Sequence, residues 1–482
     1  MCIRDRGLRF RVSVPIKKTS VLTVVARNAE GVEVIARPSF GKFAGLNGGA
    51  NKDVKSTYCI QGEYIFKYYN SQIHVFPNVL KRRIACEVRY LKKLHSLGKI
   101  QIIKYRLLYH CAKLFSRKPI WILSDRIFKA GDNGESLFKH IVSTEINKQN
   151  KVYFVFDKNS PDYQRLKTMG RVLDPKSLKY KICFLLADKI ISSHADEAVI
   201  NPFGTDKELL KNLFHFDFVY LQHGVTPGNL SSWLHKLNKN IKLMMTSARR
   251  EQESLIGGDY YYTDQEIKLT GAPRHDDIKH QDIKKVAFLP TWRENLAGKM
   301  LKGDRDRAYS LEFKHSSYCQ HYNRLINDER IIKAMKTAGF HGEFYVHPAL
   351  RQQIRDFHGN DTISVGQDLA DYDRLISESA MIVTDYSSVT FDFAYLRKRI
   401  LYTQFDSKQY WQEHFYEKGY FDYERDGFGP VCYDYESTVQ GIVDAIEENC
   451  VNPQKYMDRC NDFFQYHDKL NSRRALEAIL EM

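Results

Sequence analysis

The sequence predicts an α/β protein in which two doubly wound, Rossmann-like halves face a cleft, with a β-rich accessory domain before them. From residue 119 onward, short apolar runs alternate with stretches of helical period, which is typical of parallel sheets covered by helices. The alternation occurs in two sets, in residues 119–265 and 266–482. A chain of 482 residues is also too long for one hydrophobic core. Ligands of such folds bind at the carboxyl ends of strands, so we expect the site in the cleft.

The accessory region is predicted to span residues 1–78. Short segments rich in β-branched or aromatic residues alternate there with turns that contain Gly and Asn. The expected strands are 12–14, 21–26, 32–36 and 64–69. Residues 1–6 do not lead into this pattern, and we expect them to be a cloning or sequencing scar. Nothing in this region is typical of a catalytic site.

Residues 79–118 are predicted to form a basic amphipathic helical segment. From Lys81 to Lys118 there are twelve Lys or Arg residues and one acid, Glu87. Apolar side chains recur between them at helical intervals, among them Tyr90, Leu94, Leu97, Leu107 and Leu108. Such a helix pair fits an anionic membrane surface, with a packed helical linker as the alternative. No recognised nucleic-acid-binding module surrounds the segment, so we expect no nucleic-acid partner.

The first half, residues 119–265, is predicted to carry a histidine at the end of a strand. Its expected strands are 120–124, 152–156, 189–193 and 216–221, and its expected helices are 136–147 and 162–168. Gln222, His223 and Gly224 follow the last of these strands, and Gly224 lets the chain turn close to a ligand. One histidine at a strand end is more often structural than catalytic.

The second half, residues 266–482, repeats this arrangement. Its expected strands are 286–289, 343–346, 381–383 and 399–402. His347 follows the second of them, so histidines from both halves face the presumed cleft. Two such histidines suit a general base and a partner for developing negative charge.

A Ser-Ser turn, Ser387 and Ser388, joins the strand 381–383 to a stretch of helical spacing that begins at Val389. Hydroxyls beside the unpaired N–H groups of a helix start form a ready anion site. Taken alone, the pair is explained better by ordinary N-capping. The polar residues at the neighbouring strand ends favour the anion site.

Arg274 ends a Gly/Pro turn that begins at Thr270. A guanidinium can hold phosphate through two hydrogen bonds, while a surface ion pair is the alternative role. Pro290 and Thr291 follow the strand 286–289 and lead into a Trp-Arg pair. No single segment of this kind is specific to one class of protein, but their order in the chain and their shared location at strand ends are.

The composition indicates anionic partners. The chain has 73 Lys and Arg residues against 58 Asp and Glu, a net charge of +15, which favours a nucleotide, an anionic lipid or a polyanion. Nine cysteines without Cys-x-x-Cys pairs or metal-ligand spacing favour a reducing cytosol. No run approaches the roughly 20 apolar residues of a spanning helix, and no signal peptide is visible.

Together these segments resemble the CDP-glycerol glycerophosphotransferase family, the teichoic acid primases and polymerases of bacterial envelopes. The matching segments are Gln222-His223-Gly224, Thr270-Gly271-Ala272-Pro273-Arg274, Pro290-Thr291-Trp292-Arg293, His347-Pro348, Thr384-Asp385-Tyr386-Ser387-Ser388, Phe391-Asp392, Asp132-Asn133-Gly134-Glu135 and Tyr420-Phe421-Asp422-Tyr423. They cover residues 119–468. The resemblance implies a GT-B-type fold, a peripheral position on the cytoplasmic side of the cell membrane, and transfer of polyol phosphate from a CDP-polyol bound by the second half.

The resemblance also implies residue roles. His223 would accept the proton of the acceptor hydroxyl as it attacks the donor β-phosphate. His347 and Arg274 would hold the pyrophosphate and stabilise charge on departing CMP. The other implied substrate-binding residues are Gly224, Val225, Thr226, Pro227, Pro290, Thr291, Tyr345, Val346, Ser387, Ser388 and Asp392. Phosphoryl transfer needs mainly positioning and charge neutralisation, and the resemblance implies that this is achieved with neither a metal nor another cofactor.

The implied donors are CDP-glycerol and CDP-ribitol, and the implied acceptors are a lipid-linked acceptor or a growing polyol-phosphate chain. Three alternatives stay open. A GT-B sugar transferase or sugar-nucleotide epimerase would share the fold. A basic membrane- or polyanion-binding protein with an inactive site belongs to a second class. A nucleic-acid binder, which would show steep salt dependence, is the least favoured.

Overall fold

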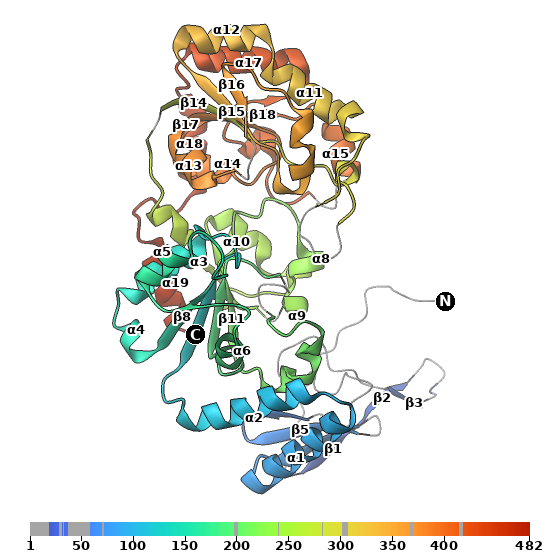
Figure 1. The fold of residues 1–482 in the computed structure, drawn as a ribbon. Helices are drawn as coiled ribbons and strands as arrows, with labels where there is room; N and C mark the ends of the chain where they lie inside the picture. Colours follow the sequence, from blue (N-terminus) through green and yellow to red (C-terminus); the bar gives the residue numbers. More distant parts are fainter. Residues whose placement is uncertain are drawn as a thin grey trace.

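The computed structural model describes residues 19–27, 31, 33–36, 58–69, 72–196, 201–239, 241–281, 283–300, 307–366, 370–413 and 418–482. Three parts follow one another along the chain (Figure 1): a small antiparallel sheet with a helix pair, a first α/β half and a second α/β half. The strand expected at 12–14 and the scar expected at 1–6 lie outside the described residues. Within the described residues, no helix is both long and apolar enough to cross a membrane.

The N-terminal part contains antiparallel strands followed by two helices. The strands are β1 (Ser20–Leu22), β2 (Val24–Arg27), β3 (Glu33–Ala36), β4 (Tyr58–Gln61), β5 (Tyr64–Tyr69) and β6 (Gln72–Pro77), and the helices are α1 (Leu80–Ser96) and α2 (Ile100–Phe115). β1, β6, β5 and β4 form one sheet in that order, and β2 pairs with β3. The predicted β-rich region and the predicted helix pair are therefore both present.

The apolar side chains that the helix pair exposes are not all those that the sequence predicted. Tyr90 and Leu94 are buried in the protein core, and the Tyr90 hydroxyl donates to Leu209 O at 3.0 Å. Leu97 and Leu107 are exposed, as a membrane-facing surface requires, and so are Leu80, Ile84 and Val88 on α1 and Ile100, Leu114 and Phe115 on α2. The error has a simple cause: the spacing of α1 contains two adjacent apolar stripes, and spacing alone does not say which one packs inward.

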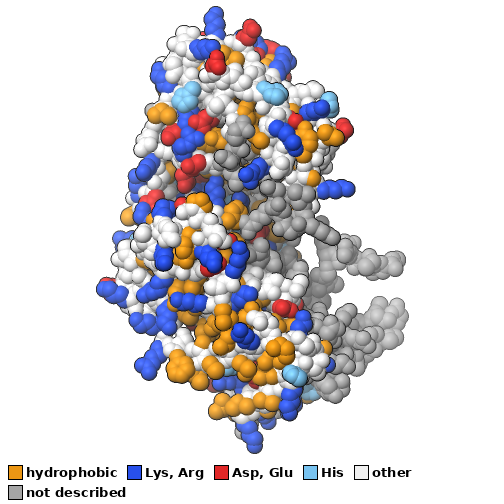
Figure 2. Space-filling model, viewed as in Figure 1, with side chains coloured by type: hydrophobic (Ala, Val, Ile, Leu, Met, Phe, Trp, Pro, Cys, Tyr) orange, Lys and Arg blue, Asp and Glu red, His pale blue; other side chains and the backbone are white. Residues whose placement is uncertain are grey.

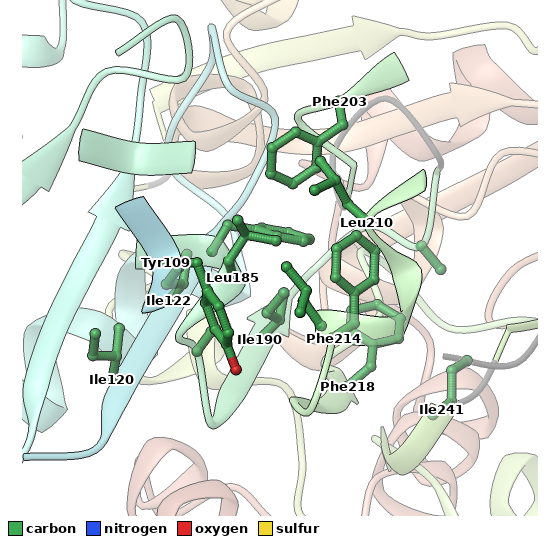
Figure 3. Packing of buried hydrophobic residues seen from close by; sticks show 14 of the residues in the cluster. Tyr109, Ile120, Ile122, Leu185, Ile190, Phe203, Leu210, Phe214, Phe218 and Ile241 are labelled. Atoms are coloured by element: carbon green, nitrogen blue, oxygen red, sulfur yellow. The ribbon is translucent and has the colours of Figure 1, made fainter. Parts of the chain in front are cut away.

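The first half is built on a seven-stranded parallel sheet with the order β13-β12-β11-β10-β7-β8-β9. Its strands are β7 (Ile120–Ser124), β8 (Lys151–Val155), β9 (Val172–Leu173), β10 (Lys189–Ser192), β11 (Asp217–Tyr220), β12 (Ile241–Thr246) and β13 (Ile267–Leu269). Its helices are α3 (Asn133–Val142), α4 (Ile146–Gln149), α5 (Tyr163–Met169), α6 (Leu178–Leu185), α8 (Ser231–Leu234), α9 (Lys236–Lys239) and α10 (Arg249–Leu255). One of its two apolar layers reaches the helix pair, where Tyr109 of α2 lies among Ile122, Leu185 and Ile190 (Figure 3).

The second half is built on a six-stranded parallel sheet with the order β16-β15-β14-β17-β18-β19. Its strands are β14 (Ile283–Phe288), β15 (His341–Phe344), β16 (Ile363–Val365), β17 (Ser379–Thr384), β18 (Arg399–Thr403) and β19 (Val431–Cys432). Its helices are α11 (Ser317–Ile326), α12 (Glu329–Ala338), α13 (Tyr372–Glu378), α14 (Thr390–Tyr395), α15 (Ser407–Glu413), α16 (Tyr423–Asp426), α17 (Tyr435–Glu447) and α18 (Gln454–Phe463). Two facing doubly wound sheets confirm the predicted fold class.

The boundary expected between residues 265 and 266 is corrected by strand pairing. β13 pairs with β12, so residues 267–269 belong to the sheet of the first half. The last helix, α19 (Asn471–Leu480), also returns to the first half, where Leu476 and Ile479 pack in its core beside α3 (Figure 1). The chain therefore crosses between the halves twice.

Candidate active site

Polar side chains follow the strands of both sheets where the strands end. Asp125 follows β7, His194 follows β10, His223 follows β11 and Arg274 follows β13. In the second half, Thr291 follows β14, His347 follows β15, and Ser387 and Ser388 follow β17. Because all strands within each sheet are parallel, these residues share one edge of their sheet.

His223 is held against a second histidine. Its ring stacks on His194, with the centroids 4.8 Å apart and the planes 16° apart. The residue as a whole is exposed, yet desolvation by the surrounding protein lowers the pKa of His223. The Asp132 carboxylate partly offsets this shift, and the charges of Arg126 and Arg274 reinforce it. The imidazole is therefore neutral near pH 7, which is the form that accepts a proton.

The backbone before His223 is strained and firmly anchored. Gln222 has a φ of 57°, a left-handed conformation that is uncommon for a residue with a side chain. Its carbonyl accepts from Asn133 Nδ2 at 2.8 Å, and its Nε2 donates to Met245 O at 2.7 Å. Strain of this kind persists when several contacts impose it, and it is common beside reacting groups.

Asp125 organises the turn that supplies Asn133. Its buried carboxylate accepts from the N–H groups of Gly134 at 2.8 Å and Glu135 at 3.0 Å, and from the Ser193 hydroxyl. A β-carbon on Gly134 would lie 2.4 Å from Asp125 Oδ1, so the close approach requires glycine. Burial, with repulsion from Asp132, raises the pKa of Asp125 to about 7.

The loop after His223 contacts the second half. A β-carbon on Gly224 would lie 3.4 Å from Ser388 Oγ, and Phe421 N donates to Pro227 O at 3.5 Å. Val225 is buried, and Thr226 N donates to the Glu251 carboxylate at 2.8 Å. The histidine loop of one half therefore lies against the serine turn of the other.

The serine turn precedes a short helix. Ser387 and Ser388 are half-buried, and α14 begins two residues later at Thr390. Ser387 Oγ accepts from Val389 N at 3.4 Å, which is a long bond for a cap. The predicted helix is present but has six residues. An anion at this turn would therefore be bound more by the two hydroxyls than by the helix dipole.

Arg274 holds the two halves together. Its guanidinium donates to both oxygens of Asp392 at 2.8 and 3.0 Å, to Asp132 at 2.9 Å and to His223 O at 2.6 Å, and its Nε donates to Asp392 at 3.1 Å. These five bonds use all five N–H donors. Burial alone would raise the pKa of Asp392, but Arg274 and His275 lower it. The Arg274 guanidinium, which the sequence predicted to hold phosphate, thus donates to carboxylates in this structure.

We expect Arg274→Lys to weaken donor binding about tenfold or more, because an ammonium cannot replace a bidentate fork between Asp132 and Asp392. The measurement is the dissociation constant of CDP-glycerol by calorimetry. Arg250→Lys is the matched control, since Arg250 also makes a two-oxygen pair across the halves, with Asp426. Equal donor affinity of Arg274→Lys and the control would remove Arg274 from the donor site.

His347 is oriented by its own backbone turn and by an indole. Its Nδ1 accepts from Ala349 N at 3.2 Å, so the neutral ring carries its proton on Nε2. Trp292 stacks on the imidazole with the ring centroids 5.9 Å apart. His347 is thereby set up as a hydrogen-bond donor through Nε2.

The segment after β14 is tied to the turn after β17. Thr291 N donates to Asp385 Oδ1 at 2.8 Å, and Arg293 bonds Asp385 and Asp406. Pro290 is buried, and no described residue hydrogen-bonds the buried Thr291 hydroxyl. Arg293 is therefore structural, and the Thr291 hydroxyl has no hydrogen-bond partner among the described residues.

Tyr345 and Val346 were expected at the end of a strand, but β15 ends at Phe344. The Tyr345 hydroxyl donates to Glu343 at 3.2 Å and accepts from Arg374 at 3.2 Å. Val346 is half-buried. Both residues lie between β15 and His347, and Tyr345 N donates to Phe288 O, at the end of β14, at 3.0 Å.

A cavity of about 240 Å³ lies in the second half, away from His223. Its lining residues are Arg293, Glu294, Asn295, Leu296, Ser316, Ser317, Tyr318, Asp406, Gln409 and Tyr410. It shares the 290–296 segment with the candidate site but none of the predicted substrate-binding residues. Within the described ranges, no cluster of three His, Cys, Asp or Glu side chains is placed to hold a metal ion.

Asp125, His194 and Glu251 support the site but were missed in the sequence, and Asn133 was noted only as part of a matching segment, without a role. Glu251 accepts from Thr226 N and from Ser247 N at 2.9 Å, and burial raises its pKa to about 7. Asp125 and His194 follow expected strands, so the strand-end rule that found His223 could have found them. Asn133 and Glu251 act through bonds between distant segments, which the sequence does not reveal.

The chain was compared with known proteins. Residues 104–481 match the family model described as CDP-glycerol:poly(glycerophosphate) glycerophosphotransferase. The minor teichoic acid biosynthesis protein GgaB of Bacillus subtilis (strain 168) is 37% identical over 453 residues, which are 92% of this chain and 49% of that protein. The teichoic acid glycerol-phosphate primase of the same strain is 25% identical over 49% of this chain and 56% of its own length. The chain thus spans about half the length of the curated relatives it matches.

A solved structure of a variant of the wall teichoic acid polymerase TagF has a TM-score of 0.55 at 14% identity, covering 80% of this chain and 95% of that chain. A TagF variant soaked with CDPG has a TM-score of 0.50 at 15% identity, covering 80% and 98%. At such identities the likeness concerns the fold. The family match and the similarity to GgaB extend over most of the chain. The chain therefore belongs to the CDP-glycerol:poly(glycerophosphate) glycerophosphotransferase family of teichoic acid enzymes.

Proposed function

We propose that the chain transfers glycerol phosphate, or ribitol phosphate, from a CDP-polyol to a hydroxyl of a membrane-linked acceptor in the synthesis of teichoic acid or a related envelope polymer. The observation that supports the proposal is the close approach of Gly224 to Ser388, which brings the loop that carries His223 in one half to the turn that carries Ser387 and Ser388 in the other. Family membership supports glycerol phosphate transfer as the chemistry. The soak of TagF with CDPG supports a CDP-polyol as the donor.

In the proposed reaction, the acceptor oxygen attacks the β-phosphorus of the CDP-polyol. The proton of the acceptor hydroxyl passes to His223, and the bond between the β-phosphorus and the bridging oxygen breaks. CMP leaves with the additional negative charge, and His347 Nε2 and the hydroxyls of Ser387 and Ser388 donate to the pyrophosphate oxygens. The part of the site that receives the cytidine nucleotide is lined by Pro290, Thr291, Tyr345 and Val346. Both oxygens of Asp392 accept hydrogen bonds from Arg274. We therefore assign Asp392 to positioning Arg274 and not to binding the donor hydroxyls.

The deciding experiment offers CDP-glycerol, CDP-ribitol and a UDP-sugar separately, each with a lipid-linked acceptor. Release of CMP from one CDP-polyol supports the proposal, and the size of the product separates addition of one unit from polymerisation. Release of UDP would favour a sugar transferase instead. If no donor is turned over but the protein binds anionic polymer, the non-catalytic alternative is favoured.

We also propose that the protein associates peripherally with the cytoplasmic side of an anionic membrane through α1 and α2. Figure 2 shows Lys, Arg and hydrophobic side chains gathered at the lower end of the molecule, where Figure 1 places these helices. Leu80, Ile84 and Val88 form an exposed row at four-residue spacing on α1. Exposed cations flank the row, including Lys81 and Lys92. Apolar side chains in the interface and cations at the headgroups suit such a surface.

Replacing Leu80, Ile84 and Val88 together with serine should reduce co-sedimentation with anionic vesicles at least tenfold, because three apolar side chains no longer enter the interface. Turnover on a water-soluble acceptor should not change. The matched control replaces Met300, Leu311 and Val451 with serine, three exposed apolar residues of the second half. Equal vesicle binding by both triple variants would show that α1 is not the anchor.

A further inference from the structure

A second cavity lies where the N-terminal sheet meets the helix pair, before the start of β11, whereas His223 follows the end of that strand. Its volume is about 290 Å³. Four segments build it: the sheet, α1, α2 and the segment 212–215 of the first half. The lining residues are Tyr58, Ile60, Gly62, Asn78, Arg83, Tyr109, His110, Lys113, Asn212, Leu213 and His215. None of them has a role in the proposed reaction.

The cavity wall is cationic. Arg83 and Lys113 carry full charges, and none of the described residues that line the cavity is acidic. The nearby Glu87 is already neutralised by Arg106, which donates to its two oxygens at 2.7 and 2.6 Å. Burial alone would raise the pKa of Glu87, but hydrogen bonds from Arg106 and His110 lower it. Lys113 Nζ donates to the Tyr109 hydroxyl at 2.9 Å, but that partner is neutral and does not balance the charge. The positive side chains of Arg83 and Lys113 therefore favour a ligand of opposite sign.

One buried donor in the cavity wall lacks a partner. Asn212 is 6% exposed, and its Oδ1 accepts from Arg106 Nη1 at 2.8 Å. This bond fixes the amide, so Nδ2 is on the opposite side, and no described residue accepts from it. A buried amide donor without an acceptor costs about 1–3 kcal/mol, so a ligand oxygen there is favoured.

We infer that this cavity binds a phosphate group, as carried by a phospholipid headgroup or by a free polyol phosphate. Arg83 and Lys113 supply the charge, and Asn212 Nδ2 supplies a directed hydrogen bond to a phosphate oxygen. Exposed apolar side chains adjoin the two cations in sequence: Ile84 follows Arg83, and Leu114 follows Lys113. An amphiphile with a phosphate head fits this combination. The site is independent of the proposed transferase reaction.

The test measures binding of two probes to the full chain by calorimetry: sn-glycerol 3-phosphate, and dihexanoyl phosphatidylglycerol below its micelle concentration. Asn212→Asp keeps the acceptor for Arg106 but replaces the Nδ2 donor with an anionic oxygen, so we expect at least tenfold weaker binding. Arg83→Gln with Lys113→Gln should have the same effect, and it tests the site even if Asn212→Asp does not fold. Lys92→Gln with Lys104→Gln removes two exposed charges from the same helices outside the cavity, and should change affinity less than twofold.

Binding of both probes would identify phosphate itself as the ligand, and binding of the lipid alone would identify a headgroup. Both results support the site, provided that the cavity variants bind the probes more weakly than the wild-type chain does. The inference is overturned if neither probe binds the wild-type chain, or if the cavity variants bind as well as the Lys92/Lys104 control. CMP release with a water-soluble acceptor should be the same in all variants, so this result stands apart from the transferase proposal.

Discussion

His223→Ala should lower turnover by about 10²–10⁴-fold while the protein stays folded, because loss of a general base has effects of this size. Desolvation keeps its imidazole neutral, and the next residue, Gly224, closely approaches Ser388 of the opposite half. The measurement is the rate of CMP release at saturating donor, with thermal unfolding as the check on folding. His223→Gln should be equally impaired, since an amide is polar but is no base at pH 7.

His140→Ala serves as the matched control, because His140 lies on α3 of the same half without a predicted role. The control should keep wild-type turnover. If His223→Ala also released CMP at nearly the wild-type rate, the residue would lose its assignment as the base. The donor site could still stand, because His347 and the serines belong to the other half.

The same environment fixes the pH dependence. The pKa of His223 is lowered from the ordinary histidine value of 6.5, so the neutral, active form persists below pH 6.5 and is lost only as the pH falls through the lowered value. The acidic limb of kcat/KM should therefore lie below 6.5. Arg126→Gln should move that limb to higher pH, because the Arg126 charge helps to lower the pKa. A limb at or above 6.5 in the wild type would contradict this electrostatic account.

Features within a single strand–turn unit could be predicted from the sequence. The strand expected at 120–124 has those bounds in the structure, and His223 and His347 both follow strands as expected. The signals are local, since a short apolar run forms a buried strand and the polar residue after it lies at the sheet edge. The fold class follows from repeating such units.

Features that depend on long-range contacts could not be predicted. The five bonds of Arg274 join Asp132 and His223 of the first half to Asp392 of the second, residues up to 142 positions from Arg274. The membership of β13 in the first sheet depends likewise on pairing with β12. Sequence spacing shows that a residue reaches a sheet edge, but the opposing residue there is set by packing of the whole fold.

His347→Ala should lower kcat by about 10²–10³-fold, the range found when one donor to a developing negative charge is lost. Its Nδ1 accepts from Ala349 N, so the neutral ring carries its proton on Nε2, and in the proposed reaction this N–H donates to the pyrophosphate as CMP leaves. Because that charge grows during the reaction, the loss should fall on kcat more than on donor KM. Steady-state CMP release over a range of CDP-glycerol concentrations separates the two constants.

Loss of the hydrogen bond between His347 and Ala349 could disturb the turn and so lower kcat indirectly. A second variant must therefore separate the cap of the turn, made by Nδ1, from the donor, Nε2. In His347→Asn the side-chain oxygen can still accept from Ala349 N, as Asn does at helix starts, but the Nδ2 donor of the shorter amide does not reach the position of Nε2. We therefore expect His347→Asn to regain the thermal stability of the wild type but not its kcat. His341→Ala, at the exposed beginning of the same strand β15, should keep both. If His347→Asn recovered full turnover, the ring would act as a cap of the turn, and the donor to the pyrophosphate would have to come from Ser387 and Ser388.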